Sequence, residues 1–244
     1  MKFELQNLNN KVFLLTGGTS GIGKEVVKLL IELGSKIVVN ARNISIVDEI
    51  ITKSSTDQIL KVAGDCANPE TTDKMVSSAI ARWNKIDGVI ANAGVGFFGS
   101  VETGTFSEIV EVINTNYLGT INLVRSSLPY LKKNKTSDIV IVSSAAGFRG
   151  NANEAVYAGT KHAQVGFAGS LDREVNKLGI KVSLVCPAGT NTNFAIGRGR
   201  NIGDLSLEEF MDPSVVANQI ITILRFPPSI RTQIWSTWSI NQES

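Results

Sequence analysis

The sequence contains few cysteines and almost no net charge, and each scarcity excludes a class of protein. Its two cysteines, Cys66 and Cys186, stand far apart without metal-like spacing, so we expect neither a disulfide framework nor a metal site. Lys and Arg number 24 against 22 Asp and Glu, a net charge of +2, which is too small to suggest a nucleic-acid or membrane-surface partner. We therefore expect a small-molecule partner and, by default, a cytoplasmic location.

Long apolar runs and linkers are also missing. No stretch approaches the roughly eighteen uninterrupted apolar residues of a membrane-spanning helix, and Glu4 stands where a signal peptide would need an apolar core. No Pro- or Ser-rich linker and no repeat divides the 244 residues. We therefore expect one soluble domain over residues 1–244.

What the sequence does contain is an alternation of short apolar runs and helical patterns. Strand candidates occupy residues 11–16, 36–40, 59–63, 88–92, 138–143, 181–186 and 232–240. Helical periodicity predicts helices over residues 23–33, 69–83, 106–131, 154–178 and 215–224. Continuous apolar strands that alternate with helices are typical of a parallel sheet covered on both faces. The predicted fold class is α/β, a single doubly wound domain with a parallel seven-stranded sheet.

A glycine-rich turn, residues 16–23, joins the first predicted strand to the first helix. Gly17 can take a conformation closed to other residues, Gly21 lets the backbone approach a pyrophosphate, and Gly23 lets helix and strand pack closely. The helix N-terminus then favours the phosphates. A tight turn that binds nothing is the alternative, which the position between strand and helix disfavours. The fold is thus expected to be Rossmann-type, with cofactor contacts from Gly17, Thr19, Ser20, Gly21, Ile22 and Gly23.

The end of the second strand indicates which dinucleotide binds. An acidic residue there would hold the ribose 2′-hydroxyl of NAD, but the segment is Asn40-Ala41-Arg42-Asn43. The Arg42 guanidinium suits bidentate contact with a 2′-phosphate. We predict NADP(H) as the cofactor, and NAD(H) remains the alternative if Arg42 is an ordinary solvated arginine.

Three further side chains suggest acid–base chemistry. Tyr157 and Lys161 are four residues apart in a helical pattern, so they share one face. A nearby ammonium would lower the tyrosine pKa from about 10 and make the pair an acid–base group. Ser144, at the end of a predicted strand, could donate a hydrogen bond to a substrate oxygen. Each signal is weak alone, but their order along the chain is specific.

With these motifs in place, the sequence resembles the short-chain dehydrogenase/reductase family, in its compact form, over nearly the whole chain. The motifs that carry the resemblance are residues 16–23, Asn92-Ala93-Gly94, Asn116, Ser144 and Tyr157-Ala-Gly-Thr-Lys161. The resemblance implies that Tyr157 exchanges a proton with the substrate oxygen while hydride moves to or from the nicotinamide. It also implies that Ser144 holds the same oxygen, Lys161 bonds the nicotinamide ribose, and Asn116 holds a water that relays protons.

The resemblance implies further cofactor contacts. Asp65 would contact the adenine, Asn92 would contribute mainly to the framework and to cofactor placement, and Ala93 and Gly94 would contact the cofactor. In the loop that begins at Pro187, Thr192 would hold the nicotinamide carboxamide, or Thr190 if the loop is rearranged, because Ala188 replaces the family's usual glycine.

We therefore expect an NADP(H)-dependent oxidoreductase that interconverts a carbonyl and a hydroxyl on a small, partly apolar molecule. An NAD-dependent alcohol dehydrogenase and a non-catalytic NADP(H)-binding sensor are the alternatives. The glycine-containing segment 193–212, with a short helix candidate at 206–211, is expected to close over the substrate. The family resemblance also implies a homodimer or homotetramer that assembles through the two long helices.

Overall fold

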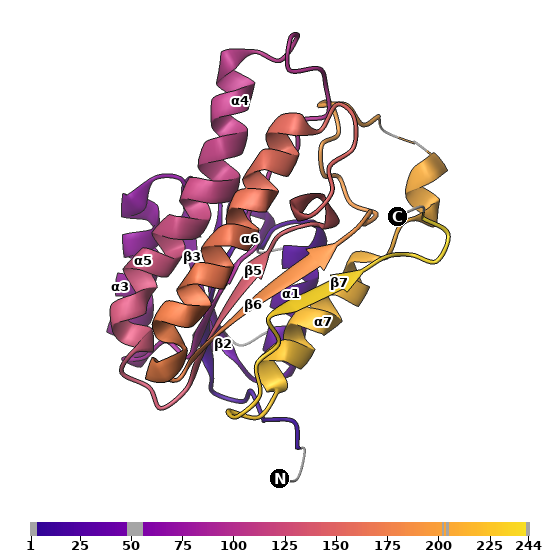
Figure 1. Cartoon of the computed structure of the whole chain (residues 1–244). Coiled ribbons are helices and arrows are strands. Elements are labelled where there is room, and N and C mark those ends of the chain that lie inside the picture. Colours follow the sequence, from indigo (N-terminus) through magenta and orange to yellow (C-terminus); the bar gives the residue numbers. More distant parts are fainter. Residues whose placement is uncertain (1–3, 48–55, 202, 204, 243–244) are drawn as a thin grey trace.

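A computed structural model of the chain describes residues 4–47, 56–201, 203 and 205–242. A seven-stranded sheet with strand order β3-β2-β1-β4-β5-β6-β7 runs through it, and every neighbouring pair is parallel (Figure 1). The strands are β1 (Val12–Thr16), β2 (Lys36–Ala41), β3 (Ile59–Ala63), β4 (Gly88–Ala91), β5 (Ser137–Val142), β6 (Ile180–Pro187) and β7 (Ile234–Thr237). The predicted α/β fold with a seven-stranded parallel sheet is confirmed.

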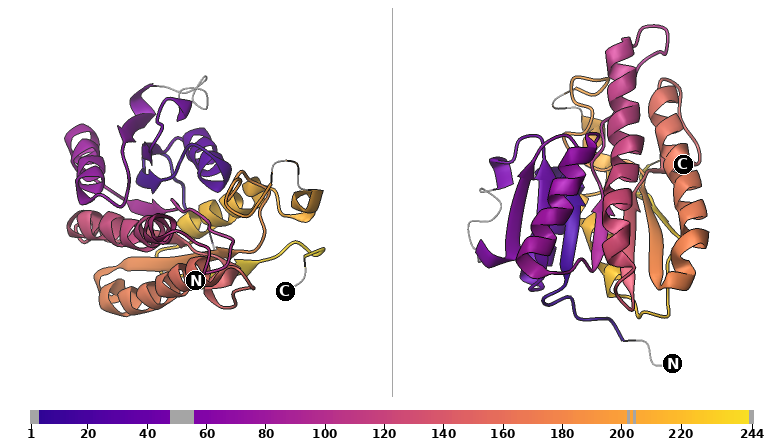
Figure 2. Two further views of the ribbon diagram at one scale, coloured as in Figure 1. Left: turned by 90° about the horizontal axis from the view of Figure 1, so that it is seen from above. Right: turned by 90° about the vertical axis from the view of Figure 1, so that its left-hand side faces the viewer.

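Helices cover both faces of the sheet (Figure 2). The helices α1 (Gly21–Glu32) and α7 (Pro213–Arg225) pack on one face, and α3 (Pro69–Trp83), α5 (Gly119–Leu131) and α6 (Ala155–Val175) on the other. Successive side chains of a strand point to opposite faces. Val12 and Leu14 of β1 accordingly pack with α3, α5 and α6, whereas Phe13 and Leu15 pack with α1 and α7.

The long helix expected over residues 106–131 is interrupted. It consists of α4 (Phe106–Ile113), a π-helical turn η2 (Asn114–Leu118) and α5. In η2 the Gly119 N–H donates to the Asn114 carbonyl, five residues back. Such π turns are frequent at functional sites, and this one contains Asn116. Figure 1 shows α4 extending beyond the sheet edge at which the strands end.

Short 3-10 turns account for several further differences from the expected elements, and β7 is shorter than the run expected over residues 232–240. The helix expected over 154–178 ends at Val175 and continues as η4 (Asn176–Leu178), and the expected helix 206–211 is the turn η5 (Leu205–Glu209). Two more, η1 (Thr56–Gln58) and η3 (Ala145–Gly147), precede β3 and follow β5. Residues 202 and 204 of the expected substrate loop, like residues 1–3 at the start, lie outside the described residues.

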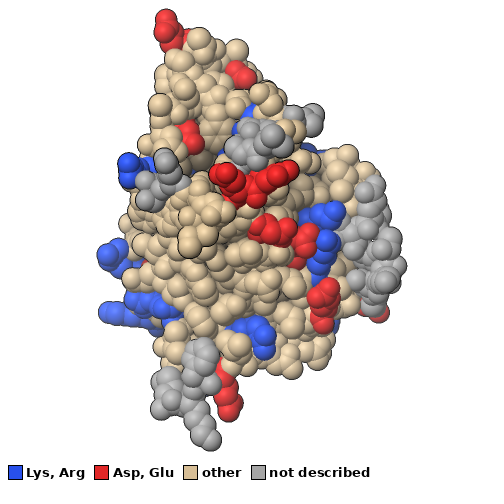
Figure 3. All heavy atoms as spheres, turned by 90° about the vertical axis from the view of Figure 1, so that its right-hand side faces the viewer, with Lys and Arg blue, Asp and Glu red and all other residues tan. Residues whose placement is uncertain are grey.

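No helix in the described part of the chain has the length and apolar character that crossing a membrane requires. Figure 3 shows a face on which acidic and basic side chains both occur, with uncharged surface between them. That face therefore carries no extended field of one sign.

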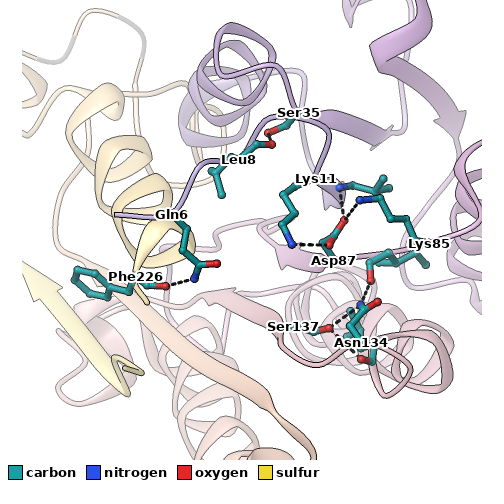
Figure 4. Close-up of polar contacts among 12 residues, drawn as sticks. Gln6, Leu8, Lys11, Ser35, Lys85, Asp87, Asn134, Ser137 and Phe226 are labelled. Atoms are coloured by element: carbon teal, nitrogen blue, oxygen red, sulfur yellow. Dashed lines mark hydrogen bonds and ion pairs between the residues drawn. The ribbon is translucent and has the colours of Figure 1, made fainter. Parts of the chain in front are cut away.

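The edge of the sheet at which the strands begin is held by polar contacts around Asp87 (Figure 4). This carboxylate accepts from the Val12 N–H at 2.8 Å and from the ammonium groups of Lys11 at 3.0 Å and Lys85 at 3.1 Å. Nearby, the Asn134 amide donates to the Ser137 hydroxyl at 2.9 Å and to a backbone carbonyl. These contacts fix the turns that join helices to strands, at the edge opposite the cleft described below.

Replacing Asp87 tests that framework role. Asp87→Ala leaves the buried Val12 N–H without its acceptor, and we expect the free energy of unfolding in urea to fall by about 2 kcal/mol. Lys85→Ala, which removes only a half-exposed ion pair, is the control and should cost less than about 1 kcal/mol. Equal losses in the two variants would show that the Val12 contact contributes nothing.

Candidate active site

A cleft of about 730 Å³ runs along the edge at which the strands end. In open α/β sheets ligands bind outside these carboxyl ends. The predicted cofactor residues all line it, together with Ser144: Gly17, Thr19, Ser20, Gly21, Ile22, Gly23, Arg42, Asp65, Asn92, Ala93, Gly94, Tyr157, Lys161, Pro187, Thr190 and Thr192. Asn116 is fully buried and lies outside this lining. The sequence thus identified groups that the fold brings into one space.

The glycine turn has the geometry that the sequence predicts. Gly17 and Gly21 have φ of +72° and +50°, conformations that other residues rarely adopt. A Cβ at Gly21 would come within 2.9 Å of the Thr192 side chain, and one at Gly23 would collide with the Gly17 carbonyl. The turn is therefore a close-fitting cradle at the N-terminus of α1.

The cradle fits a dinucleotide pyrophosphate. Ser20, the N-cap residue of α1, makes no side-chain capping bond, and the first turn of α1 contains no acidic residue. Nothing in that turn therefore opposes a phosphate at the positive end of the helix dipole. Asn92 holds the cradle by donating to the carbonyls of Thr16 at 3.1 Å and Gly17 at 2.9 Å, which agrees with the framework role expected for it.

Arg42 follows β2 at the cleft rim and carries an ion pair that the sequence did not predict. Its Nη1 lies 2.9 Å from Oε1 of Glu111, and Oε2 of the same carboxylate lies 2.7 Å from Nη2 of Arg198. Burial tends to raise the pKa of Glu111, but the bonds and charges of Arg198 and Arg42 hold it below its ordinary value. Glu111 therefore stays ionised and connects α4 to the β2 end and to the segment 193–212.

Tyr157 and Lys161 lie on one face of α6, as their spacing predicts, and both are buried. The expectation that Lys161 lowers the tyrosine pKa is wrong for this structure. Burial raises the pKa of Tyr157 to about 12, and it is the hydrogen bond with Ser144 that acts in the lowering direction. Burial also lowers the pKa of Lys161 to about 8. The physical reason is desolvation, which penalises the charged form of each group.

The Lys161 ammonium has neutral acceptors. Its Nζ donates to the Val142 carbonyl at 3.0 Å and to Oε1 of Gln164 at 3.1 Å, and lies 5.7 Å from the centre of the Tyr157 ring. Gln164 was not among the residues that the sequence predicted for the site. A polar residue among apolar ones at the buried face of a helix was the signal that could have found it.

Asn116 is held entirely by protein groups. Its Oδ1 accepts from the Val95 N–H at 2.8 Å, and its Nδ2 donates to the Val95 carbonyl at 3.0 Å and the Thr160 hydroxyl at 3.1 Å. Its own carbonyl accepts from the Thr120 hydroxyl at 2.7 Å and from Nε2 of Gln164 at 2.8 Å. The groups that the resemblance assigns to a relay water thus already have partners.

The loop after β6 places both threonines at the cleft. Thr192 lies against Gly21, and its hydroxyl accepts from the Phe194 N–H at 3.3 Å. The Thr190 hydroxyl instead donates to the Ala188 carbonyl at 3.2 Å. The contacts leave Thr192 and Thr190 as alternative partners of a nicotinamide.

The end of the cleft beside Tyr157 is aromatic. The rings of Phe98 and Phe194 each lie 5.6 Å from the Tyr157 ring, centre to centre. The Arg200 guanidinium stacks over Phe98 at 5.0 Å and over Phe210 at 5.4 Å. Trp238 and Gln242 also line the cleft, and neither they nor Arg200 were predicted as site residues. The groups come from segments too far apart in the sequence for a local pattern to join them.

Comparison with known proteins gives consistent results. The family model described as short chain dehydrogenase matches residues 11–202. The 3-ketodihydrosphingosine reductase of Bacteroides thetaiotaomicron is 30% identical over 86% of this chain and 76% of its own. The ipsdienol dehydrogenase of Ips pini is 28% identical over 90% of this chain and 92% of its own.

Solved structures agree on the fold. An alcohol dehydrogenase from the archaeon Thermococcus sibiricus, complexed with 5-hydroxy-NADP, superposes with a TM-score of 0.87 at 23% identity, over 97% of this chain and 99% of the other. A 3-ketoacyl-(acyl-carrier-protein) reductase from Brucella melitensis, complexed with NADH, gives a TM-score of 0.81 at 24% identity, over 94% and 97%.

Gly21→Ala tests the pyrophosphate cradle. The added methyl group meets Thr192 and forces a left-handed residue, so we expect dinucleotide affinity to fall roughly tenfold or more. The measurement is titration of NADPH fluorescence with the folded protein. Lys28→Ala, on the same helix but outside the cleft lining, is the matched control and should bind as the wild type does. Unchanged binding by Gly21→Ala would remove the cradle from the cofactor site.

Proposed function

Because the chain belongs to the short chain dehydrogenase family, an oxidoreductase family that binds nicotinamide cofactors, we propose that it is an NADP(H)-dependent enzyme that interconverts a carbonyl and a hydroxyl. The observation that carries the proposal is the shared cleft, which has the glycine turn and Arg42 at one part and Ser144, Tyr157 and Lys161 at another. NADPH, when bound, supplies the hydride. Carbonyl reduction is the proposed direction.

The acid–base roles follow from the state of each group. A pKa of about 12 keeps the Tyr157 hydroxyl protonated near neutral pH, so it can give its proton to the carbonyl oxygen as the substrate is reduced. Ser144 lies close enough to Tyr157 to act on its pKa, so its hydroxyl lies where it can hold the same substrate oxygen. Lys161, with a pKa of about 8, is the cation below that pH and becomes neutral above it. We propose that Lys161 bonds the nicotinamide ribose. Asn116 remains among the proposed catalytic residues.

The substrate is proposed to be a small, partly apolar molecule. Phe98 and Phe194 beside Tyr157 support an apolar surface at the reacting carbon. The segment 193–212 carries Phe194 and Arg200 at this end of the cleft and Arg198, whose side chain reaches Glu111, and we propose that this segment closes over the substrate. Two relatives carry the names of a reductase and a dehydrogenase, which supports chemistry in either direction.

Cofactor preference rests on Arg42. The absence of an acid after β2 and the position of Arg42 in the cleft support NADP(H). The ion pair with Glu111 favours the second candidate, an NAD-dependent alcohol dehydrogenase, because Glu111 competes with a 2′-phosphate for the guanidinium. We favour NADP(H) because the Arg42 side chain is 66% exposed, and an exposed ion pair is worth only about 0–1 kcal/mol.

Assembly and location complete the proposal. Phe106, Ile113 and Leu118 on α4 and η2 are apolar and exposed, which supports association of two or four copies through the long helices. Cys66 and Cys186 are both buried free thiols, which supports the reducing cytoplasm.

Tyr157→Phe tests the proposed chemistry. Without the hydroxyl, NADPH-dependent reduction of a ketone and aldehyde panel should fall at least about a hundredfold, while the dissociation constant for NADPH stays within roughly twofold. Tyr130→Phe, which removes a hydroxyl outside the cleft lining, is the control. Undiminished turnover in Tyr157→Phe would exclude the proposed acid, and NADPH binding without any turnover by the wild type would favour a sensor.

Arg42→Ala and Glu111→Gln test the cofactor preference in opposite directions. Loss of the guanidinium should weaken NADPH binding by about tenfold and leave NADH binding unchanged. Glu111→Gln removes the competing charge and should strengthen NADPH binding severalfold. A wild type that binds NADH as tightly as NADPH, together with no effect of Arg42→Ala, would establish the NAD-dependent alternative.

A further inference from the structure

A buried amide joins two groups of the proposed site. Gln164 lies on α6, three residues after Lys161, and is completely buried. Its Oε1 accepts from Nζ of Lys161 at 3.1 Å, and its Nε2 donates to the Asn116 carbonyl at 2.8 Å and to the Thr120 hydroxyl oxygen at 2.9 Å. The amide therefore fills the space between the ammonium of Lys161 and the π turn that contains Asn116.

The chemistry of the neighbours determines the orientation of this amide. The Asn116 carbonyl can only accept and the Lys161 ammonium can only donate. The opposite orientation would set NH₂ against the ammonium and oxygen against the carbonyl, so the amide is held one way round. The Thr120 hydroxyl donates to the Asn116 carbonyl at 2.7 Å, which leaves its oxygen to accept from Gln164. Both N–H groups of the amide are thus in use.

We propose that Gln164 is a positioning residue that holds the Lys161 ammonium beside Tyr157 and closes the inner route for protons between Lys161 and Asn116. The proposal rests on the proposed function, in which Lys161 serves Tyr157. It replaces the water that the family resemblance places on Asn116 with a fixed protein group.

The Gln164 amide determines by which route a proton can return to Tyr157. When Tyr157 gives its proton to the substrate oxygen, the phenolate must regain one from solvent. A carboxamide neither takes up nor releases a proton near neutral pH, so the hydrogen-bonded series Lys161, Gln164, Asn116 cannot carry it. Tyr157 and Lys161 line the cleft, whereas Gln164 and Asn116 are absent from its described lining. Reprotonation therefore comes from the open side of the cleft.

The surroundings of Lys161 make the amide oxygen important. The titratable groups that face it are the Tyr157 ring on α6 and the Cys186 thiol on β6. From β5 it meets the neutral Val142 carbonyl, and Gln164 connects it by hydrogen bonds to the Asn116 carbonyl of η2. A cation that is 3% exposed and has two neutral acceptors depends strongly on each of them.

The experiment compares Gln164→Leu with Gln164→Glu in the full-length protein. The Lys161 pKa is read by NMR of ¹³C-labelled lysine, with the signal assigned by its loss in Lys161→Met. Loss of the acceptor in Gln164→Leu should lower this pKa by about one unit, and the carboxylate in Gln164→Glu should raise it by about one unit. Thr120→Val, which removes one of the two acceptors of the amide N–H groups without touching Lys161, is the control and should leave the pKa unchanged.

Kinetics add the second readout. The alkaline limb of the kcat profile for carbonyl reduction should shift with the Lys161 pKa in each variant, while KM changes little. In the pH range where its own kcat is constant, Gln164→Leu should have a kcat within about tenfold of the wild-type value, because the proton does not pass through the amide. A loss of a hundredfold on the plateau, or shifts of equal sign in the two variants, would overturn the proposal. The NMR titration needs no turnover, so an inactive wild type would contradict the proposed function and leave the test of Gln164 intact.

Discussion

Parallel alignment of all seven strands is the constraint on which the site depends. It brings every carboxyl end to one edge of the sheet, so residues far apart in the sequence meet there: the turn after β1, Arg42 after β2, Ser144 after β5 and Pro187 at the end of β6. Parallel strands need crossover connections, and these supply the helices that bury both faces. The same rule places the Asp87 contacts at the opposite edge, where they stabilise the framework away from the chemistry.

Burial is the second constraint, and it acts on Tyr157 and Lys161 in opposite directions. Desolvation favours the neutral form of each, raising the pKa of the tyrosine and lowering that of the lysine. The spacing of the two residues places them together but does not make the ammonium the main influence on the hydroxyl. Hydrogen bonds oppose the effect of burial without overcoming it: Ser144 acts against the rise in the Tyr157 pKa, and neutral oxygens from β5 and α6 accept from the Lys161 ammonium.

The sequence predicts the part of this structure that depends on local pattern. The buried strands are continuous apolar runs, and the glycine turn has the conformation that its composition requires. The π turn at Asn114–Leu118 was missed because the apolar periodicity of residues 106–131 continues through it. Gln164 and Glu111 were missed for another reason. Their partners, Asn116 and Arg42, are 48 and 69 residues away, and no local pattern indicates which distant group a single polar side chain will meet.

The polar groups behind the Tyr157 part of the cleft and those at its rim near Arg42 differ in how firmly they are held. Lys161, Gln164 and Asn116 are at most 3% exposed and bind one another or backbone groups, so moving any of them leaves a buried polar group unpaired, at a cost of about 1–3 kcal/mol. The pairs that Glu111 forms with Arg42 and Arg198 are partly exposed, and each exchanges with solvent or another anion at much smaller cost. A rigid interior around Tyr157 and Lys161 and an adjustable rim around Arg42 therefore arise from the same gradient of burial. On the proposed assignment of Arg42 to the cofactor ribose, that gradient lets cofactor selectivity change without disturbing the acid–base geometry.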